Sequence, residues 1–550
     1  MLIHAIKMFW FLTIFMLTSV NVYSILNPGP RYPPTKGEVW PKPQHEITEL
    51  TYYIFDPSTF KVKETNNTCD ILTSAIERYS YIVRSLKPQR DQRPVSRTER
   101  RQRALQAQTL KLGVLQELQL QLTEPCEDYP HLEMDEKYKL SITAVSILSS
   151  ASVWGILRGL ETFAQKFYIS DDINELRINT SVVEDFPEYA HRGLLLDTGR
   201  HYISVPNILL TLDAMAMNKM NVFHWHIVDD QSFPYQSEKF PDLSLYGAYH
   251  SSMVYTKDNI EQIVEYARLR GIRVLPEFDV PGHTRSWGNA YPNILTPCYR
   301  GNEVEGLGPM NPIRNITYKM IRDLFHEVQA RFPDKYLHIG GDEVQMQCWL
   351  SNPEIRKYMR KNGLKVEKLY VLFMKNTIPL LADGSKIVVW QEVFDEDVPL
   401  TNDTLVQVWK DNWVEEMVKV LEAGRRVIFS SSWYLNYQLN EWATFYIADP
   451  RCMVRNATGK DSLPAGVIGG EACMWGEMVD DRNVISRVWP RASAVAERLW
   501  SAPKSSQHRR YYCETSPQPE VYHRMEEHVC RMNRRGIAAQ PASGPGFCVV

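Results

Sequence analysis

The sequence lacks a clear excess of charge of either sign. Its 62 Lys and Arg against 65 Asp and Glu give a formal net charge of -3 in 550 residues. A protein that attracts nucleic acid usually carries a marked basic surplus. The one basic segment, with eight basic residues between Arg84 and Arg103, has little hydrophobic content; this is typical of a solvated loop, with a polyanion-binding patch as the alternative. The composition therefore gives no reason to expect a nucleic-acid partner.

After its N-terminal segment the chain also lacks any apolar run long enough to cross a bilayer. Lys7 precedes an apolar stretch over 8–20, and residues 22–24 are small or modest side chains of the kind that a signal peptidase reads. The pattern predicts a signal peptide over 1–24 and a mature chain from about residue 25. We expect a soluble product in a lumen or outside the cell, without stable membrane insertion.

Cysteine is scarce in this sequence, but an exported chain with this many cysteines is expected to form disulfides. Nine cysteines indicate several disulfides and at least one unpaired thiol. Their connectivity does not follow from sequence, although Cys530 and Cys548 are close enough to close a short loop. Cys473, in the apolar run 467–475, is expected to be a buried thiol. Five sequons predict glycosylation, at Asn66, Asn179, Asn315, Asn402 and Asn456.

The length allows a barrel-sized domain and a smaller one. Within residues 25–188, alternation over 110–122 and 138–143 predicts half-buried strands, and helical spacing over 153–167 predicts an amphipathic helix. This part of the chain is expected to be an α+β domain.

Residues 189–550 repeat one pattern, a short apolar run that ends in polar or aromatic residues and precedes a helix-length amphipathic segment. Eight such strand and helix repeats predict a (β/α)8 TIM barrel, with its active site at the carboxyl ends of the strands. The runs are 193–197, 221–230, 272–279, 336–343, 387–392, 405–410, 427–434 and 467–477.

Two adjacent carboxylates, Asp342 and Glu343, follow one of these runs and a glycine pair. Adjacent acids at a strand end repel each other and lose hydration, so stability alone does not account for them. A carboxyl pair with one protonated member is what acid-catalysed cleavage of a glycosidic bond requires. The alternative is a solvated Asp-Glu turn.

The other seven runs also end in side chains that suit a sugar pocket. Acids and arginine bind hydroxyls, and indoles pack on the apolar faces of sugar rings or on an acetamido methyl. The side chains are Asp197 and Arg200; His224, His226, Asp229 and Asp230; Asp279 and His283; Trp390 and Glu392; Trp409; Trp433, Tyr434 and Asn436; Trp475 and Glu477.

Each of these residues has an alternative role. A tryptophan at a strand end is equally well a packing residue. His224 and His226 share one face of a strand, which is how some barrel hydrolases hold a metal, or they support Asp and Glu as hydrogen-bond donors. Asp229 and Asp230 are candidates for a buried network that tunes a catalytic carboxyl.

Five motifs give the chain a close resemblance to the lysosomal β-N-acetylhexosaminidases of glycoside hydrolase family 20, over about 40–548. They are His338-Ile339-Gly340-Gly341-Asp342-Glu343, His224-Trp225-His226-Ile227-Val228-Asp229-Asp230, Pro281-Gly282-His283-Thr284, Trp390-Gln391-Glu392-Val393 and Gly470-Glu471-Ala472-Cys473-Met474-Trp475-Gly476-Glu477. The order and length of these motifs are far more specific than one acidic dipeptide.

The resemblance implies substrate-assisted catalysis, in which the 2-acetamido group of the substrate is the nucleophile and an oxazoline-type intermediate forms. Glu343 matches the general acid, and Asp342 matches the residue that orients the acetamide. Tyr434 would donate a hydrogen bond to the acetamido oxygen. The indole walls would be Trp390, Trp409 and Trp475.

The resemblance also implies substrate-binding residues and disulfides. Arg200 would hold the 3- and 4-hydroxyls and Glu477 the 4-hydroxyl of a terminal sugar, while Asp229 and His283 would support the acid. No metal or other cofactor is implied. The implied disulfides pair Cys69 with Cys126, Cys298 with Cys348, and Cys530 with Cys548; a bridge between Cys452 and Cys513 remains open.

One departure concerns sugars sulfated at the 6-position. The family form that is limited to neutral sugars has Asp two residues after the pocket tyrosine, and the sulfate-tolerant form has Asn followed by Arg. Here Asn436 is followed by Tyr437, so the chain matches the sulfate-tolerant form at one position only.

These patterns together predict a retaining exo-β-N-acetylhexosaminidase, lysosomal or secreted, and by resemblance a homodimer. Its substrates would be oligosaccharides, glycoproteins or glycolipids with terminal β-linked GlcNAc or GalNAc. The alternatives are a carbohydrate-binding protein that kept the pocket without turnover, and a metal-dependent hydrolase built on His224 and His226.

Overall fold

The computed structural model describes residues 35–64, 67–86, 110–170, 175–437, 441–501, 513–543 and 548. The predicted signal peptide, most of the basic segment and the sequon at Asn66 lie outside the described residues. No helix among these ranges is long and apolar enough to cross a membrane.

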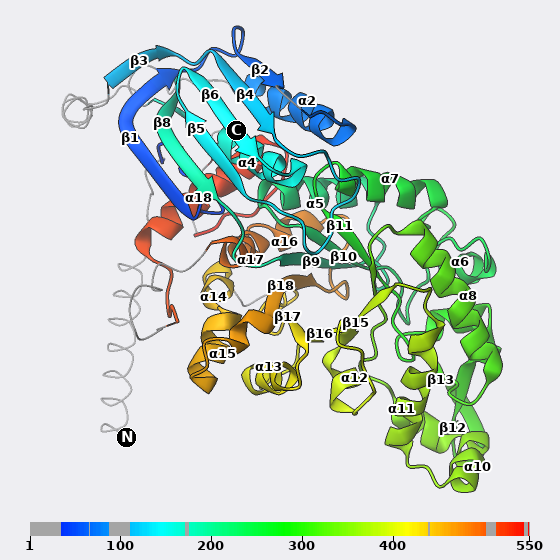
Figure 1. Cartoon of the computed structure of the whole chain (residues 1–550). Coiled ribbons are helices and arrows are strands. Elements are labelled where there is room, and N and C mark those ends of the chain that lie inside the picture. The colour runs from blue at the N-terminus through cyan, green and yellow to red at the C-terminus, as the bar shows by residue number, and fades with distance from the viewer. Residues whose placement is uncertain are drawn as a thin grey trace, which may run out of the picture.

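The N-terminal part folds around one curved sheet (Figure 1). Its strand order is β2-β4-β6-β5-β8-β1-β3, with β7 paired to β8. Two helices, α2 (Asp70–Ser85) and α4 (Val153–Gln165), pack their apolar stripes into the core of this sheet. The strands are β1 His45–Ile54, β2 Lys61–Glu64, β3 Leu110–Val114, β4 Glu117–Leu122, β5 Tyr138–Ile142, β6 Val145–Ser150, β7 Phe167–Ile169 and β8 Leu176–Asp185.

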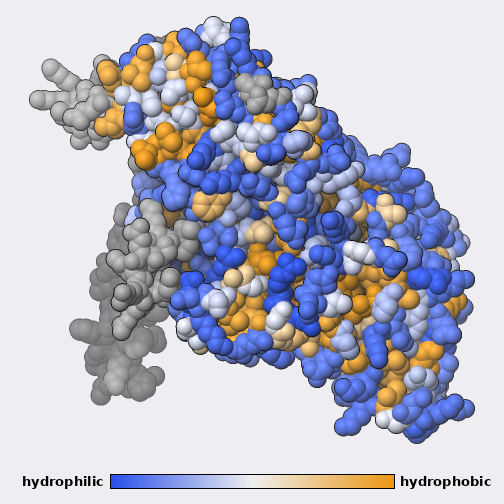
Figure 2. Space-filling model, viewed as in Figure 1, coloured by the Kyte–Doolittle hydropathy of each residue, from blue (hydrophilic) through white to orange (hydrophobic). Residues whose placement is uncertain are grey.

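The expectation of one strand over 110–122 is wrong. The segment forms two strands, and Leu115 and Gln116 between them donate backbone hydrogen bonds to Ile54 and Ala144. β3 pairs with β1, whereas β4 pairs with β2 and β6, so the alternation belongs to two ladders of the same sheet. Figure 2 shows apolar side chains on the surface of this domain. Exposed apolar residues of its sheet include Ile47 and Leu50 of β1 and Val182 of β8.

The C-terminal part is a closed barrel of eight parallel strands, which confirms the predicted (β/α)8 fold. Each of the eight predicted runs contains one strand. The strands are β9 His191–Asp197, β10 Val222–His226, β11 Arg273–Glu277, β14 Tyr336–His338, β15 Lys386–Trp390, β16 Leu405–Val408, β17 Arg426–Phe429 and β18 Val467–Met474.

Helices cover the outside of the barrel, and a hairpin of β12 (Leu295–Arg300) and β13 (Glu303–Met310) extends from it. The helices are α5 Val205–Met217, α6 Asp242–Gly247, α7 Lys257–Arg268, α8 Asn315–Arg331, α9 Met346–Ser351, α10 Pro353–Asn362, α11 Val366–Thr377, α12 Gln391–Asp395, α13 Trp413–Glu422, α14 Trp442–Ile447, α15 Pro450–Thr458, α16 Val484–Val488, α17 Arg491–Trp500 and α18 Pro519–Arg534.

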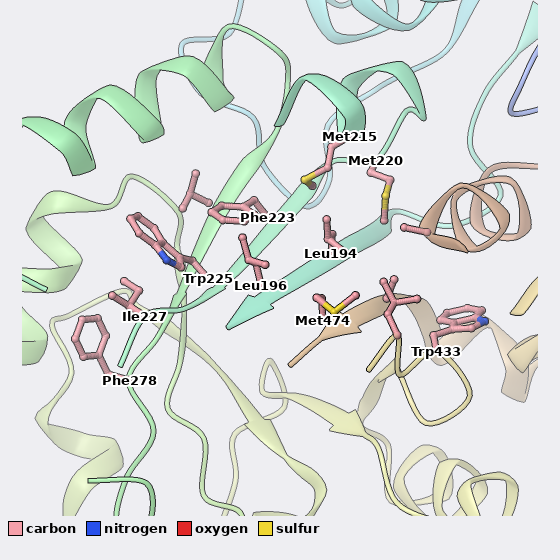
Figure 3. Packing of buried hydrophobic residues seen from close by; sticks show 14 of the residues in the cluster. Leu194, Leu196, Met215, Met220, Phe223, Trp225, Ile227, Phe278, Trp433 and Met474 are labelled. Atoms are coloured by element: carbon pink, nitrogen blue, oxygen red, sulfur yellow. The ribbon is translucent and has the colours of Figure 1, made fainter. Parts of the chain in front are cut away.

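Alternate residues of the barrel strands face outward and inward. Leu194, Leu196, Phe223 and Trp225 face the helices and form part of a large apolar cluster (Figure 3). Part of the interior is filled by an apolar cluster to which the consecutive strands from β10 to β18 contribute, with Val222 as one member. Further along, the interior turns polar, which is where the candidate site begins.

Buried ion pairs join the two parts of the chain. Glu136 accepts from Arg158 at 2.8 Å and from Arg192 of β9 at 2.6 Å, and all three side chains are almost fully buried. Lys219 donates to Asp185 at 2.8 Å in the same interface. The barrel and the N-terminal sheet therefore share a desolvated ionic contact.

The three implied disulfides are present in the structure, as Cys69–Cys126, Cys298–Cys348 and Cys530–Cys548. The bridge left open is also formed, between Cys452 and Cys513. Cys473 is a buried free thiol, as expected.

The described sequons differ in their surroundings. Asn315, Asn402 and Asn456 are exposed. Asn179 is only 8 % exposed, and its side-chain oxygen accepts a hydrogen bond from Tyr168 at 2.8 Å. This burial argues against a glycan at Asn179, while glycosylation at the other positions stays a prediction.

Candidate active site

Four aromatic side chains meet at the carboxyl ends of neighbouring strands. The ring centroid of Trp390 lies 6.4 Å from that of Trp409 and 6.0 Å from that of Trp475. Tyr434 stacks on Trp409 at 6.1 Å and lies 6.2 Å from Trp475. The predicted indole walls and the predicted tyrosine therefore form one aromatic cluster.

The strands place these rings and fix their tilt. Trp390 is the last residue of β15, and Trp409 and Trp475 directly follow β16 and β18. The indole N–H of Trp390 donates to Glu277 at 2.8 Å, and that of Trp409 donates to Glu392 at 3.0 Å. Tyr434 is held by a parallel bridge to Cys473. Hydrogen bonds thus orient two of the walls before any ligand binds.

The carboxylate pair lies on a sharp turn after β14. Gly340 and Gly341 have φ of +66° and +104°, and Glu343 has φ of +49°. A Cβ on Gly340 would lie 1.7 Å from an oxygen of Asp279. Both the positive φ and the lack of room for a side chain therefore require glycine at this position. The strained turn presents Asp342 and Glu343 above the barrel, which is typical of a functional site.

His283 joins the two carboxylates to a third acid. Its Nε2 lies 3.6 Å from an oxygen of Asp342 and 3.6 Å from an oxygen of Glu343. Its Nδ1 lies 3.1 Å from Asp229. His283 itself has φ of +54°. Asp229, His283 and Glu343 therefore form a row, as the predicted support of the acid requires.

Arg200 closes the other side of Asp229. Its guanidinium donates to Asp197 at 3.2 Å, lies 3.0 Å from Asp229, and stands 5.0 Å from the ring centroid of Trp475. Burial disfavours the cation, but Asp197 and Asp229 outweigh burial and raise the pKa of Arg200. Arg200 is thus a fixed cation at the rim of the aromatic cluster.

The charges divide unevenly among the acids. Burial and the nearby Asp342 raise the pKa of Asp279. Burial opposes the charged form of His283, but Asp342, Asp229 and Glu343 raise its pKa. The imidazole of His283, 3.6 Å away, lowers the pKa of Glu343, whose side chain is 57 % exposed. Both the exposure of Glu343 and the imidazole beside it therefore favour its charged carboxylate.

Asn436 and Glu477 lie together beside the cluster. They line a cavity of about 110 Å³, to which Arg487 also contributes. The side-chain oxygen of Asn436 is buried without a hydrogen-bond partner among the described residues. Tyr437 is 59 % exposed and stacks on Tyr434 at 5.9 Å. A cation thus reaches the Asn436 cavity from α16.

Trp433, a strand-end residue in the sequence, lies outside this group. It is fully buried, its indole N–H donates to the Phe445 carbonyl at 3.0 Å, and Figure 3 shows it in the apolar cluster outside the barrel. Neighbours on a strand point to opposite faces, so Trp433 packs while Tyr434 faces the site.

His224 and His226 both point into the barrel, and a carboxylate oxygen lies next to each of their ring nitrogens. The nitrogens of His226 lie 2.6 Å from Glu277 and 2.7 Å from Asp229. Those of His224 lie 2.7 Å from Glu471 and 3.0 Å from Glu277. These contacts fit the hydrogen-bonding alternative for the two histidines, and His224, Glu277 and His338 also place one ligand atom each within 4.8 Å of one another, as the metal alternative requires.

Glu277 and Glu471 are the residues that sequence reasoning missed. Glu471 lies within the otherwise apolar β18 and Glu277 is the last residue of β11, and each is fully buried. A charged residue in a strand covered on both faces needs a partner, and this signal is present in the printed sequence.

A closed parallel barrel whose strand ends gather carboxylates, one arginine and several indoles defines a carbohydrate-active hydrolase. Residues 189–503 match the description "Glycosyl hydrolase family 20, catalytic domain", and residues 39–166 match "beta-acetyl hexosaminidase like". The chain belongs to glycosyl hydrolase family 20.

The chain is similar to its relatives over nearly its whole length. It is 43 % identical to the β-hexosaminidase subunit β of Felis catus over 93 % of both chains. It is 42 % identical to the β-hexosaminidase subunit α of Bos taurus, covering 93 % of this chain and 94 % of that one. The crystal structure of Flavobacterium johnsoniae chitobiase aligns with a TM-score of 0.77 and 30 % identity, over 92 % of this chain and 74 % of the other.

Proposed function

We propose that the protein is a retaining exo-β-N-acetylhexosaminidase that removes terminal β-linked GlcNAc or GalNAc by substrate-assisted catalysis. The observation that carries this proposal is that the Asp342 and Glu343 turn lies against His283 and next to the aromatic cluster, where burial, Cys473 and the charge of Asp342 raise the pKa of Tyr434. The high-coverage hexosaminidase relatives support the same activity.

Glu343 acts as the general acid in this proposal. In the free protein it is exposed to water and its pKa is lowered, chiefly by the neighbouring imidazole of His283. A sugar bound over it would exclude water, which favours the neutral carboxyl and so prepares the proton for the leaving oxygen. The deprotonated Glu343 then activates the water that opens the intermediate, giving retention.

Asp342 orients the acetamido group so that its oxygen attacks C1. Its carboxylate stabilises the positive charge that develops on the acetamido nitrogen, and Asp279 and His283 lie beside it. Tyr434 donates to the acetamido oxygen, and Trp390, Trp409 and Trp475 confine the methyl group.

Arg200 and Glu477 bind the hydroxyls of the terminal sugar, which makes the enzyme exo-acting. Glu477 is exposed, and its carboxylate attracts the Arg200 guanidinium, because the two side chains place opposite charges on neighbouring parts of the rim. Asp229 and His283 support Glu343 rather than contact the sugar.

The test uses aryl β-GlcNAc, aryl β-GalNAc and 6-sulfo aryl β-GlcNAc, each with and without EDTA. Hydrolysis of both neutral substrates that is unaffected by EDTA supports the proposal. Binding without turnover identifies a carbohydrate-binding protein, and loss of activity with EDTA identifies a metal-dependent hydrolase.

The protein acts on oligosaccharides, glycoproteins or glycolipids in the lysosome or outside the cell. The N-terminal apolar stretch and the disulfides support an exported protein. A homodimer is proposed because the animal relatives are described as subunits; sedimentation of the purified chain tests it.

A further inference from the structure

A row of alternating imidazoles and carboxylates runs from the candidate acid down the inside of the barrel. Each member lies within ion-pair distance of the next, and those beyond His283 are almost fully buried. The contacts are Glu343 to His283 at 3.6 Å, His283 to Asp229 at 3.1 Å, Asp229 to His226 at 2.7 Å, His226 to Glu277 at 2.6 Å, Glu277 to His224 at 3.0 Å, His224 to Glu471 at 2.7 Å and Glu471 to His191 at 2.7 Å.

Glu277 is the branch point of this row. One of its oxygens faces His226 and His224, and the other faces His338 at 3.1 Å and the indole N–H of Trp390 at 2.8 Å. The same carboxylate therefore touches the row that leads to Glu343 and one wall of the aromatic cluster.

Such a row is costly inside a barrel. Buried ion pairs seldom stabilise a protein more than well-packed apolar residues do, and barrel interiors are usually filled with branched aliphatic side chains. Here apolar residues such as Val222 and Leu275 fill only part of the interior, and the imidazoles and carboxylates of the row fill the rest below the site. The polar layer directly below the site calls for a functional explanation.

We propose that Glu277 is a positioning residue for the catalytic acid: it keeps His226 protonated, and the charge on His226, acting through Asp229, controls how tightly His283 and Glu343 hold their protons. Glu471 does the same for His224, one step further from the acid. This inference rests on the proposed role of Glu343.

The direction of the effect follows from the charges that face each group. His283 faces the carboxylates of Asp229, Asp279, Asp342 and Glu343 and lies close to the Arg200 cation. His226 faces Asp229 and Glu277, with the charge of Asp197 also near. When Glu277 loses its charge and His226 becomes neutral, one negative and one positive charge disappear. The lost positive charge on His226 is the nearer of the two to His283, so the protons on His283 and Glu343 become harder to remove.

The variant Glu277→Gln makes this change with little loss of shape. The amide oxygen still accepts from Trp390, while the amide N–H₂ faces His226, which must then accept a hydrogen bond and stay neutral. His226 still donates to Asp229 through its other nitrogen. Glu136→Gln is the matched control, because Glu136 is equally buried and ion-paired but lies in the domain interface.

The measurement is the pH profile of kcat/KM on an aryl β-GlcNAc, with the aryl leaving group chosen so that protonation is required. We expect the basic limb of Glu277→Gln to move upward by about half a pH unit or more, since unit charges a few ångströms apart interact at that strength in a partly desolvated site. Glu471→Gln should move it in the same direction by less, and Glu136→Gln should not move it.

His226→Gln gives a second test if Glu277→Gln fails to fold, because its amide still donates to Asp229 without carrying charge. An unshifted basic limb in the folded variant, or an equal shift in Glu136→Gln, overturns the inference. Failure of the proposed function would look different, because the unchanged protein would then show no turnover or no basic limb.

Discussion

In the proposed mechanism the protonation of Glu343, an exposed carboxylate with an adjacent imidazole, decides the rate. The variant Glu343→Gln removes the proton donor but keeps the shape. We expect turnover of substrates with poor leaving groups to fall by about 10²–10⁴-fold, while good leaving groups need no protonation and change much less. Steady-state rates on a series of aryl leaving groups check this. Equal losses across the series would remove Glu343 from the acid role.

A sulfate at the 6-position is expected to meet Asn436 in a cavity that Arg487 also lines. Asn436 carries no charge to repel the sulfate and Tyr437 supplies no cation, while the Arg487 cation that lines the cavity is opposed there by the carboxylate of Glu477. We therefore expect weak but measurable hydrolysis of 6-sulfo aryl β-GlcNAc.

Two substitutions adjust that activity in opposite directions. Asn436→Asp should lower the ratio of sulfated to neutral kcat/KM, through like-charge repulsion, and Tyr437→Arg should raise it. Neutral substrate serves as the internal control. If neither variant changes the ratio, position 436 does not face the 6-substituent.

At the scale of elements, the turn after β14 depends on a residue without a side chain. Gly340→Ala would place a Cβ 1.7 Å from Asp279, at a positive φ. Because the turn carries both Asp342 and Glu343, a displacement of about 1 Å should lower kcat by roughly 100-fold. Kinetics of the folded variant measure this.

Gly384→Ala is the matched control for that turn. Gly384 has φ of +80°, yet an added Cβ there meets nothing within 4 Å. Both variants carry backbone strain of about 1–2 kcal/mol, so a loss of kcat confined to Gly340→Ala isolates the contact with Asp279. An equal loss in both would mean that strain, not the contact, controls activity.

Elements were predictable where a local pattern decides them. Each barrel strand is buried on both faces, so it reads as an apolar run, and the polar ends could be located from sequence. The two strands within 110–122 were not separable, because one alternation continues through both and only their pairing partners differ. Glu277 was passed over because its partners, His226 and His224, come from another strand.

The protonation of the site was the least predictable feature. Sequence places Glu343 next to Asp342, but its surroundings come from His283, which is 60 residues earlier in the chain. Whether a carboxyl holds a proton depends on such contacts and on exposure, and neither follows from neighbours in sequence.

For the whole molecule, Glu136 connects the N-terminal domain to the barrel. Glu136→Gln leaves Arg158 and Arg192 buried with no full negative charge, so we expect the free energy of unfolding to fall by about 3 kcal/mol. Chemical denaturation measures this change. The kcat of the folded variant should be retained, since the pair lies far from the turn at Asp342; a loss of kcat without a loss of stability would contradict this assignment.

The central claim is that the substrate's own acetamide is the nucleophile. The most direct measurement is kcat/KM for aryl β-GlcNAc substrates whose acetyl group carries none, one, two or three fluorine atoms, since each fluorine makes the carbonyl oxygen less nucleophilic. We predict a steep, progressive fall across the series, by orders of magnitude in total. A flat series, or a covalent glycosyl intermediate trapped on Asp342 or Glu343, would contradict the account.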